Sequence, residues 1–178
     1  MQRIPALAAT AAPAASQPML EAVRKKLGMV PNLFKTFAHS PAVLQYYLAG
    51  SEALGHGELP AGLREQIALV AAGANECDYC ASAHTLMGKG AGLSAAEMSD
   101  NLHGRSADAK TQAALDFAAA IVTARGRVSD AQLQAVRAAG YSDAEVVEIV
   151  AHVAASIFTN YFNHIAGTEI DFPVVRAR

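Results

Sequence analysis

The sequence has few cysteines, no long apolar run and no large excess of charge. Only two cysteines occur in 178 residues, which excludes a secreted scaffold held together by several disulfides. No apolar run approaches the roughly 18–20 residues that a membrane-spanning helix needs. The net charge is −2, and the basic cluster at residues 24–26 is typical of a solvated helix face, so we expect neither a nucleic-acid nor a membrane partner.

Apolar residues, in contrast, are abundant. Hydrophobic residues make up 52% of the chain and charged residues 17%, which is ample for the core of one domain. The mean hydropathy of +0.19 is high for a soluble monomer, and we therefore expect interfaces between identical subunits to bury the excess. A CxxC pair outside a disulfide scaffold favours a cytoplasmic protein. Because three prolines interrupt the first twenty residues, we expect an N-terminal arm over residues 1–17 and not a cleaved signal peptide.

Helix signals recur along the chain, whereas strand alternation is absent. Three segments place a serine at an N-cap and Glu or Gln three residues later, as in a capping box: Ser94 to Glu97, Ser129 to Gln132 and Ser142 to Glu145. Apolar residues between such signals have helical spacing, and glycines 104, 126, 140 and 167 follow the expected helix ends. We expect Pro41 in the first turn of a helix that ends near Gly55, and Pro60 in the first turn of another that runs to about Asn75.

These signals predict an all-α fold. We expect a single-domain bundle of about seven to nine helices over residues 18–178. The segment after residue 167 is extended and apolar, and we expect it to pack on something, such as a neighbouring subunit.

Residues 76–84 read ECDYCASAH and contain both cysteines. A cysteine is nucleophilic as the thiolate, and its free pKa of about 8.5 leaves a small thiolate fraction at neutral pH. If a helix begins near Asp78, Cys77 and Cys80 lie at its positive end, which favours a thiolate. His84 lies one turn after Cys80 on the same face, where it can exchange a proton. Upstream, Glu65 stands in a largely apolar helix, where the pattern alone favours a surface glutamate beside Arg64.

Several interpretations of the two cysteines remain open from the residues alone. A structural zinc site would need a fourth ligand beyond Cys77, Cys80 and His84, and the chain has no second CxxC. A thioredoxin-like oxidoreductase would need strands in a βαβ setting. An inert, buried pair in a non-enzymatic interaction module is the remaining alternative, because cysteine is among the most buried residue types.

The spacing of Glu65, Cys77, Cys80 and His84, within REQIALVAAGANECDYCASAHTLMGKGAGLS, resembles the core of the alkylhydroperoxidase D-like and carboxymuconolactone decarboxylase superfamily. The flanking segments VPNLFKTFAHSPAVLQYYL and NYFNHIAGTEIDFPVV are similar to its peroxidase-related branch. The resemblance extends from residue 29 to residue 175, and this signature is far more specific than a lone CxxC.

The resemblance implies homotrimers or homohexamers of an all-α subunit that reduces organic hydroperoxides without a cofactor or metal. It implies that Cys80 is oxidised to a sulfenic acid and that Cys77 donates a proton and then resolves it as a disulfide. Glu65 and His84 would form a proton relay, and a separate thiol reductant would regenerate the dithiol. Cysteines at i and i+3 can reach disulfide geometry. The best-known family pattern has a histidine immediately before the second cysteine, but this chain has Tyr79, which cannot act as a base at neutral pH.

A carboxymuconolactone-type decarboxylase shares the fold without needing a cysteine pair and stays open as an alternative.

Other polar residues have weaker signals. A polar face on the last helix lines either a pocket over the thiols or a seam between subunits: His152, Ser156, Thr159 and Asn163. We interpret the remaining histidines, at 39, 56, 103 and 164, as structural residues, three of them near helix ends.

Overall fold

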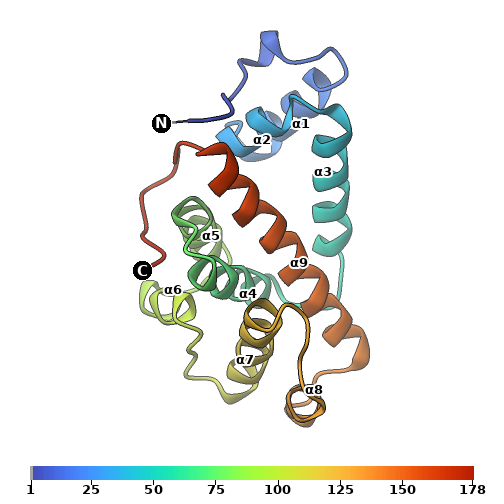
Figure 1. The fold of residues 1–178 in the computed structure, drawn as a ribbon, viewed down its shortest axis with the longest axis vertical. Helices are drawn as coiled ribbons and strands as arrows, with labels where there is room; N and C mark the ends of the chain where they lie inside the picture. The colour runs from blue at the N-terminus through green and yellow to red at the C-terminus, as the bar shows by residue number, and fades with distance from the viewer. Residues whose placement is uncertain (1) are drawn as a thin grey trace.

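A computed structural model describes residues 2–178 (Figure 1). This range contains nine α-helices, a short 3-10 helix at Ala9–Ala11 and no β-strand, which confirms the all-α prediction. None of the helices in residues 2–178 is long and apolar enough to cross a membrane. The helices are α1 (Gln17–Leu27), α2 (Asn32–Phe37), α3 (Pro41–Gly55), α4 (Ala61–Ala74), α5 (Asp78–Gly90), α6 (Ala95–Leu102), α7 (Ala109–Thr123), α8 (Asp130–Ala138) and α9 (Asp143–Ala166).

Local capping accounts for several of these boundaries. All three predicted capping boxes form, at the starts of α6, α8 and α9. The helix predicted from Pro41 has the expected bounds. Pro60, in contrast, is the N-cap of α4 and not part of its first turn, because its backbone is extended, with φ −57° and ψ 147°.

Helix α4 is the centre of the molecule and packs against α5, α6, α7 and α9 (Figure 1). Most of its residues from position 63 to position 73 are buried. Gly73 permits its close approach to α6, because a Cβ at this position would lie 1.9 Å from the carbonyl oxygen of Leu102. Two apolar clusters lie around it, one shared with α7, α8 and α9, and one that contains both cysteines and the residues of α2 and α3.

The C-terminal segment packs against α5 of its own chain, which answers the expectation that it packs on something. The backbone nitrogen of Val175 donates to Ser82 Oγ at 2.9 Å, and that of Ala177 donates to Asp78 Oδ1 at 2.9 Å. Arg176 forms an ion pair with Asp78. At the other terminus, Arg3 donates its backbone N–H to Ala166, at the end of α9. The division into an arm over residues 1–17 and a domain over 18–178 stays a prediction.

Candidate active site

The turn between α4 and α5 places both cysteines. Glu76 has a positive φ of 55°, and the N–H of Cys77 returns to the carbonyl of Ala72 at 2.9 Å. Cys77 is the N-cap of α5, and its sulfur accepts the backbone N–H of Cys80 at 3.4 Å. Both sulfurs therefore lie at the positive end of the α5 macrodipole, as the sequence predicted.

The two thiols are reduced, buried and in direct contact. Cys77 Sγ donates to Cys80 Sγ at 2.8 Å, and the residues are 2% and 3% exposed. This donation lowers the pKa of Cys80 to about 6, an effect that outweighs its burial and that the charge of His84 reinforces. The same contact, together with burial, raises the pKa of Cys77. The pair is thus asymmetric, with Cys80 as the thiolate and Cys77 as the proton-bearing partner.

His84 and Glu65 meet beside the thiols from two different helices. His84 Nδ1 lies 2.8 Å from Glu65 Oε2, and their side chains are 18% and 20% exposed. Burial by itself lowers the pKa of His84, but the hydrogen bond and charge of Glu65 and the charge of Cys80 outweigh it and raise the pKa overall. Glu65 is therefore not the surface partner of Arg64 that the apolar pattern alone favoured. Arg64 instead donates to the carbonyls at positions 55 and 59.

Two asparagines of α9 lie at the thiols. Asn163 Nδ2 donates to Cys80 Sγ at 3.3 Å, so one member of the predicted polar face reaches the site. Asn160 was missed by the sequence analysis, although it is completely buried and its Oδ1 accepts from Asn75 Nδ2 at 2.8 Å. The sequence signal that could have identified Asn160 is a second amide, three residues before Asn163, on an otherwise apolar helix.

The hydroxyls in that polar face donate to groups other than the sulfurs. The hydroxyls of Ser156 and Thr159 donate to carbonyls of their own helix. Burial and the charge of Arg64 lower the pKa of His152 overall. The charge of Glu65 acts in the opposite direction, which indicates that His152 lies near the predicted relay.

Tyr79 connects three segments. Its hydroxyl accepts the backbone N–H of Leu33 at 3.1 Å and donates to Asp171 Oδ1 at 3.1 Å. Its ring meets Phe172 edge-on, with 5.5 Å between centroids. Burial raises the pKa of Tyr79 well above its usual value, so the phenol stays neutral. Tyr79 therefore stabilises the packing of the C-terminal segment on α5.

Three of the four remaining histidines contact backbone carbonyls through their rings, in keeping with structural roles. His39, His103 and His164 each place a ring nitrogen 2.8–2.9 Å from a carbonyl oxygen, and His56 is the C-cap of α3. Within residues 2–178, no group of three or more His, Cys, Asp or Glu side chains is arranged to hold a metal ion.

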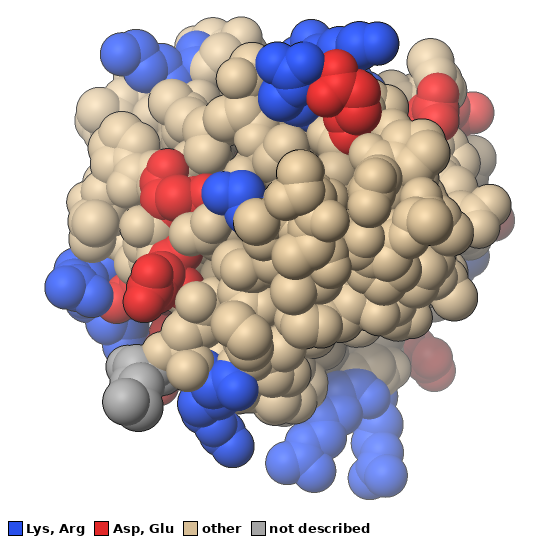
Figure 2. All heavy atoms as spheres, turned by 90° about the horizontal axis from the view of Figure 1, so that it is seen from above, with Lys and Arg blue, Asp and Glu red and all other residues tan. Residues whose placement is uncertain are grey.

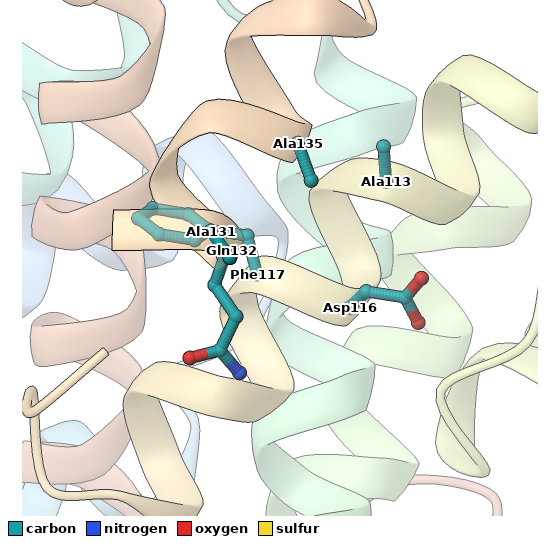
Figure 3. A pocket seen from close by; sticks show the side chains of 6 residues that line it. All are labelled: Ala113, Asp116, Phe117, Ala131, Gln132 and Ala135. Atoms are coloured by element: carbon teal, nitrogen blue, oxygen red, sulfur yellow. The ribbon is translucent and has the colours of Figure 1, made fainter. Parts of the chain in front are cut away.

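Two hollows on the surface have linings that include neither cysteine. One, of about 330 Å³, lies between α7 and α8 (Figure 3) and is lined largely by alanines together with Asp116, Phe117 and Gln132. A second, of about 280 Å³, is lined by residues of the α4 start, α7 and α9. Neither includes any of the four predicted site residues. The candidate site is therefore the group of reactive side chains around the two cysteines.

Comparisons with known proteins agree with this fold. Residues 41–124 match the model of the carboxymuconolactone decarboxylase family. A solved structure described as an alkylhydroperoxidase AhpD core, an uncharacterized peroxidase-related protein from Ralstonia eutropha JMP134, is 29% identical with a TM-score of 0.85, over 96% of this chain and 92% of that chain. A peroxidase-related protein from Silicibacter sp. TM1040 is 26% identical with a TM-score of 0.82, over 94% and 92%.

A more distant structure, the debrominase Bmp8 in its apo form, has the same fold, with 21% identity and a TM-score of 0.80 over 94% of this chain and 91% of that chain. No curated protein sequence matches the chain. The family match and the two peroxidase-related structures confirm the resemblance found in the sequence. The chain is therefore similar to the alkylhydroperoxidase D-like and carboxymuconolactone decarboxylase superfamily, and it has the fold of the two peroxidase-related structures.

Proposed function

We propose that the protein is an antioxidant thiol peroxidase that reduces organic hydroperoxides through Cys80. The observation that carries this proposal is the 2.8 Å contact in which Cys77 donates to Cys80, beside the His84 and Glu65 pair. A lone buried CxxC would not need such an arrangement. An asymmetric dithiol with an adjacent proton carrier is what a thiol peroxidase requires.

In the first step, the Cys80 thiolate attacks the terminal oxygen of the hydroperoxide. An S–O bond forms and the O–O bond breaks, so that Cys80 becomes a sulfenic acid and an alkoxide leaves. His84, whose pKa is raised, supplies the proton that converts the alkoxide into an alcohol. Glu65 holds the imidazole through its Nδ1 and stabilises the protonated form.

In the second step, Cys77 attacks the sulfur of the sulfenic acid. An S–S bond forms and the S–O bond breaks, and the departing hydroxide takes the proton of Cys77 and leaves as water. The sum is one hydroperoxide and two thiols converted into an alcohol, water and a disulfide. A separate thiol reductant then regenerates the dithiol.

Apolar surroundings support an organic hydroperoxide. Both cysteines belong to a buried cluster with Leu44, Leu69 and Phe37, and the rings of Phe158 and Phe162 pack against it. Such walls suit an alkyl or aryl group.

The test is a count of free thiols in reduced protein before and after one equivalent of cumene hydroperoxide, with mass spectrometry of the peptide 77–84. We expect both thiols to disappear and the peptide to lose about two daltons, as disulfide formation requires. Cys77→Ser is the matched control, because it should stop at a sulfenic acid that dimedone traps. Cys80→Ser should consume no peroxide, and turnover by this variant would refute the proposal.

The decarboxylase alternative uses no thiol and predicts that both thiols survive peroxide. The paired, unequal cysteines favour thiol chemistry, and the same thiol count separates the two functions.

We further propose that the subunit assembles with its own copies, as a homotrimer or homohexamer. Large apolar side chains stay exposed on α9 and α3, among them Val147, Tyr161, Ile165 and Tyr46. Figure 2 shows a broad area of one face without Lys, Arg, Asp or Glu. Exposed apolar area of this kind is typical of subunit interfaces. A cytoplasmic location remains our proposal from the cysteine content.

A further inference from the structure

Two side-chain amides of α9 lie near the sulfur of Cys80, and neither belongs to the predicted proton relay. Asn163 donates to the sulfur at 3.3 Å and is 5% exposed. Asn160, three residues earlier on the same helix, is completely buried. Amides this deep in a core normally have partners for all of their polar atoms.

The amide of Asn160 is held in one orientation and has a spare donor. Its oxygen accepts the Nδ2–H of Asn75 at 2.8 Å, and because a side-chain amide has one oxygen and one nitrogen, this bond sets the direction of the nitrogen. That nitrogen is buried and has no hydrogen-bond partner within residues 2–178. Asn75 is itself held, because its carbonyl lies 2.8 Å from His164 Nε2.

We propose that Asn160 and Asn163 form a two-amide clamp that stabilises negative charge on the sulfur of Cys80, and that Asn75 is the positioning residue that orients Asn160. The proposal rests on the proposed function only in taking Cys80 as the reacting group. An amide has no titratable proton in the working range, so the clamp acts at every pH, whereas the help from His84 ends when its imidazole loses its proton.

The electrostatics of the site agree with the clamp. The pKa of Cys80 is low first because Cys77 donates to it, and the amides of Asn160 and Asn163 act in the same direction as His84. Asn160 lowers that pKa as a side-chain donor directed at Cys80, although its Nδ2 completes no hydrogen bond of good geometry within residues 2–178, so this donor can close on the sulfur as negative charge builds up.

The other titratable groups near Cys80 come from three helices. His84 and Tyr79 belong to α5, and Cys77 is its N-cap. Glu65 of α4 is hydrogen-bonded to His84, and Tyr47 of α3 is near enough for the charge of Cys80 to raise its pKa. Burial raises the pKa of Tyr47 to about 12, so it stays neutral, as Tyr79 does. The amides are therefore the polar groups that α9 presents to the thiolate.

The experiment measures the rate of alkylation of Cys80 by iodoacetamide from about pH 4.5 to 9.5. Substitution of Asn160→Leu keeps the size of the side chain and removes the donor. We expect its pH midpoint to rise by at least about half a unit, with alkylation at acidic pH slowed about threefold or more. Asn160→Asp, which keeps the shape and adds a like charge, should raise the midpoint further and serves if the leucine variant does not fold.

Two further variants separate the clamp from a merely structural role. Asn75→Ala should also raise the midpoint, because Asn160 then loses the bond that orients it. Asn101→Ala is the matched control, since Asn101 is also completely buried but donates to the carbonyl of Arg105, and it should leave the midpoint unchanged.

A midpoint that stays in place in folded Asn160→Leu or Asn160→Asp would overturn the clamp, as would an equal shift in Asn101→Ala. Alkylation needs no peroxide, so the two proposals can fail separately. If the midpoint moves as expected but cumene hydroperoxide is not consumed, the clamp stands and the peroxidase function fails.

Discussion

Replacing Cys77 with alanine should make Cys80 a weaker acid and a slower nucleophile near neutral pH. The structure identifies the thiol of Cys77 as the largest influence on the pKa of Cys80, through a 2.8 Å contact between two buried sulfurs. The substitution removes a hydrogen-bond donor that stabilises the thiolate of Cys80 more than its neutral thiol. Loss of such a donor raises the pKa of an acid, so the expected change is upward.

The size of the effect follows from the strength of a hydrogen bond to a charged group. Such a bond contributes about 1.5–3 kcal/mol, and one pKa unit corresponds to about 1.4 kcal/mol, so the pKa should rise by about one to two units. The pKa of Cys80 starts at about 6, at which roughly nine-tenths of the sulfur is thiolate at pH 7. After the substitution this share should fall to between about a half and a tenth, and alkylation at pH 7 should slow roughly two- to tenfold.

The assay is iodoacetamide labelling followed by mass spectrometry of the peptide 77–84, which assigns the modified sulfur. Cys77 should react little in the wild type until Cys80 is modified, because its own pKa is raised. Above about pH 9 the two proteins should react at similar rates, since Cys80 is then mostly thiolate in both. Cys77→Ser retains a hydroxyl donor and should fall between the wild type and Cys77→Ala. A Cys77→Ala midpoint at the wild-type pH would refute the assignment of Cys77 as the donor.

Two further predictions concern the relay and the central helix. Glu65→Gln removes the charge that raises the pKa of His84, so the alkaline limb of kcat/KM for cumene hydroperoxide should move to lower pH, while the acid limb stays near the pKa of Cys80. An alkaline limb that stays in place would contradict the relay. Gly73→Ala brings a Cβ to 1.9 Å from a backbone carbonyl and should lower the free energy of unfolding by about 1–3 kcal/mol in urea titration. Gly50→Ala, on an exposed and open part of α3, should raise it by about 0.5–1 kcal/mol, and equal effects of the two would contradict the packing.

The elements that the sequence predicted best are those whose interactions are local. A capping box such as Ser94 with Glu97 closes within three residues, so its pattern specifies a helix start directly. The relation of Cys80 to His84 is equally local, because positions i and i+4 share a helix face whatever the helix packs against. The prediction that Pro60 lies in the first helical turn was wrong by one position, because Pro60 is the N-cap of α4. The fixed φ of proline is compatible with both positions, so the sequence does not distinguish them.

By itself, therefore, the sequence determined the helices, the position of both cysteines at the start of one helix and, through the spacing of four residues, the resemblance to a family. The tertiary structure alone decided which side chains meet at the sulfurs. Glu65 reaches His84 because α4 packs against α5, and the amides of α9 reach Cys80 and Asn75 across more than eighty residues of chain. The roles of Tyr79 and of the C-terminal segment were decided in the same way, because the partners of a buried polar group depend on how whole helices pack and not on its neighbours in sequence.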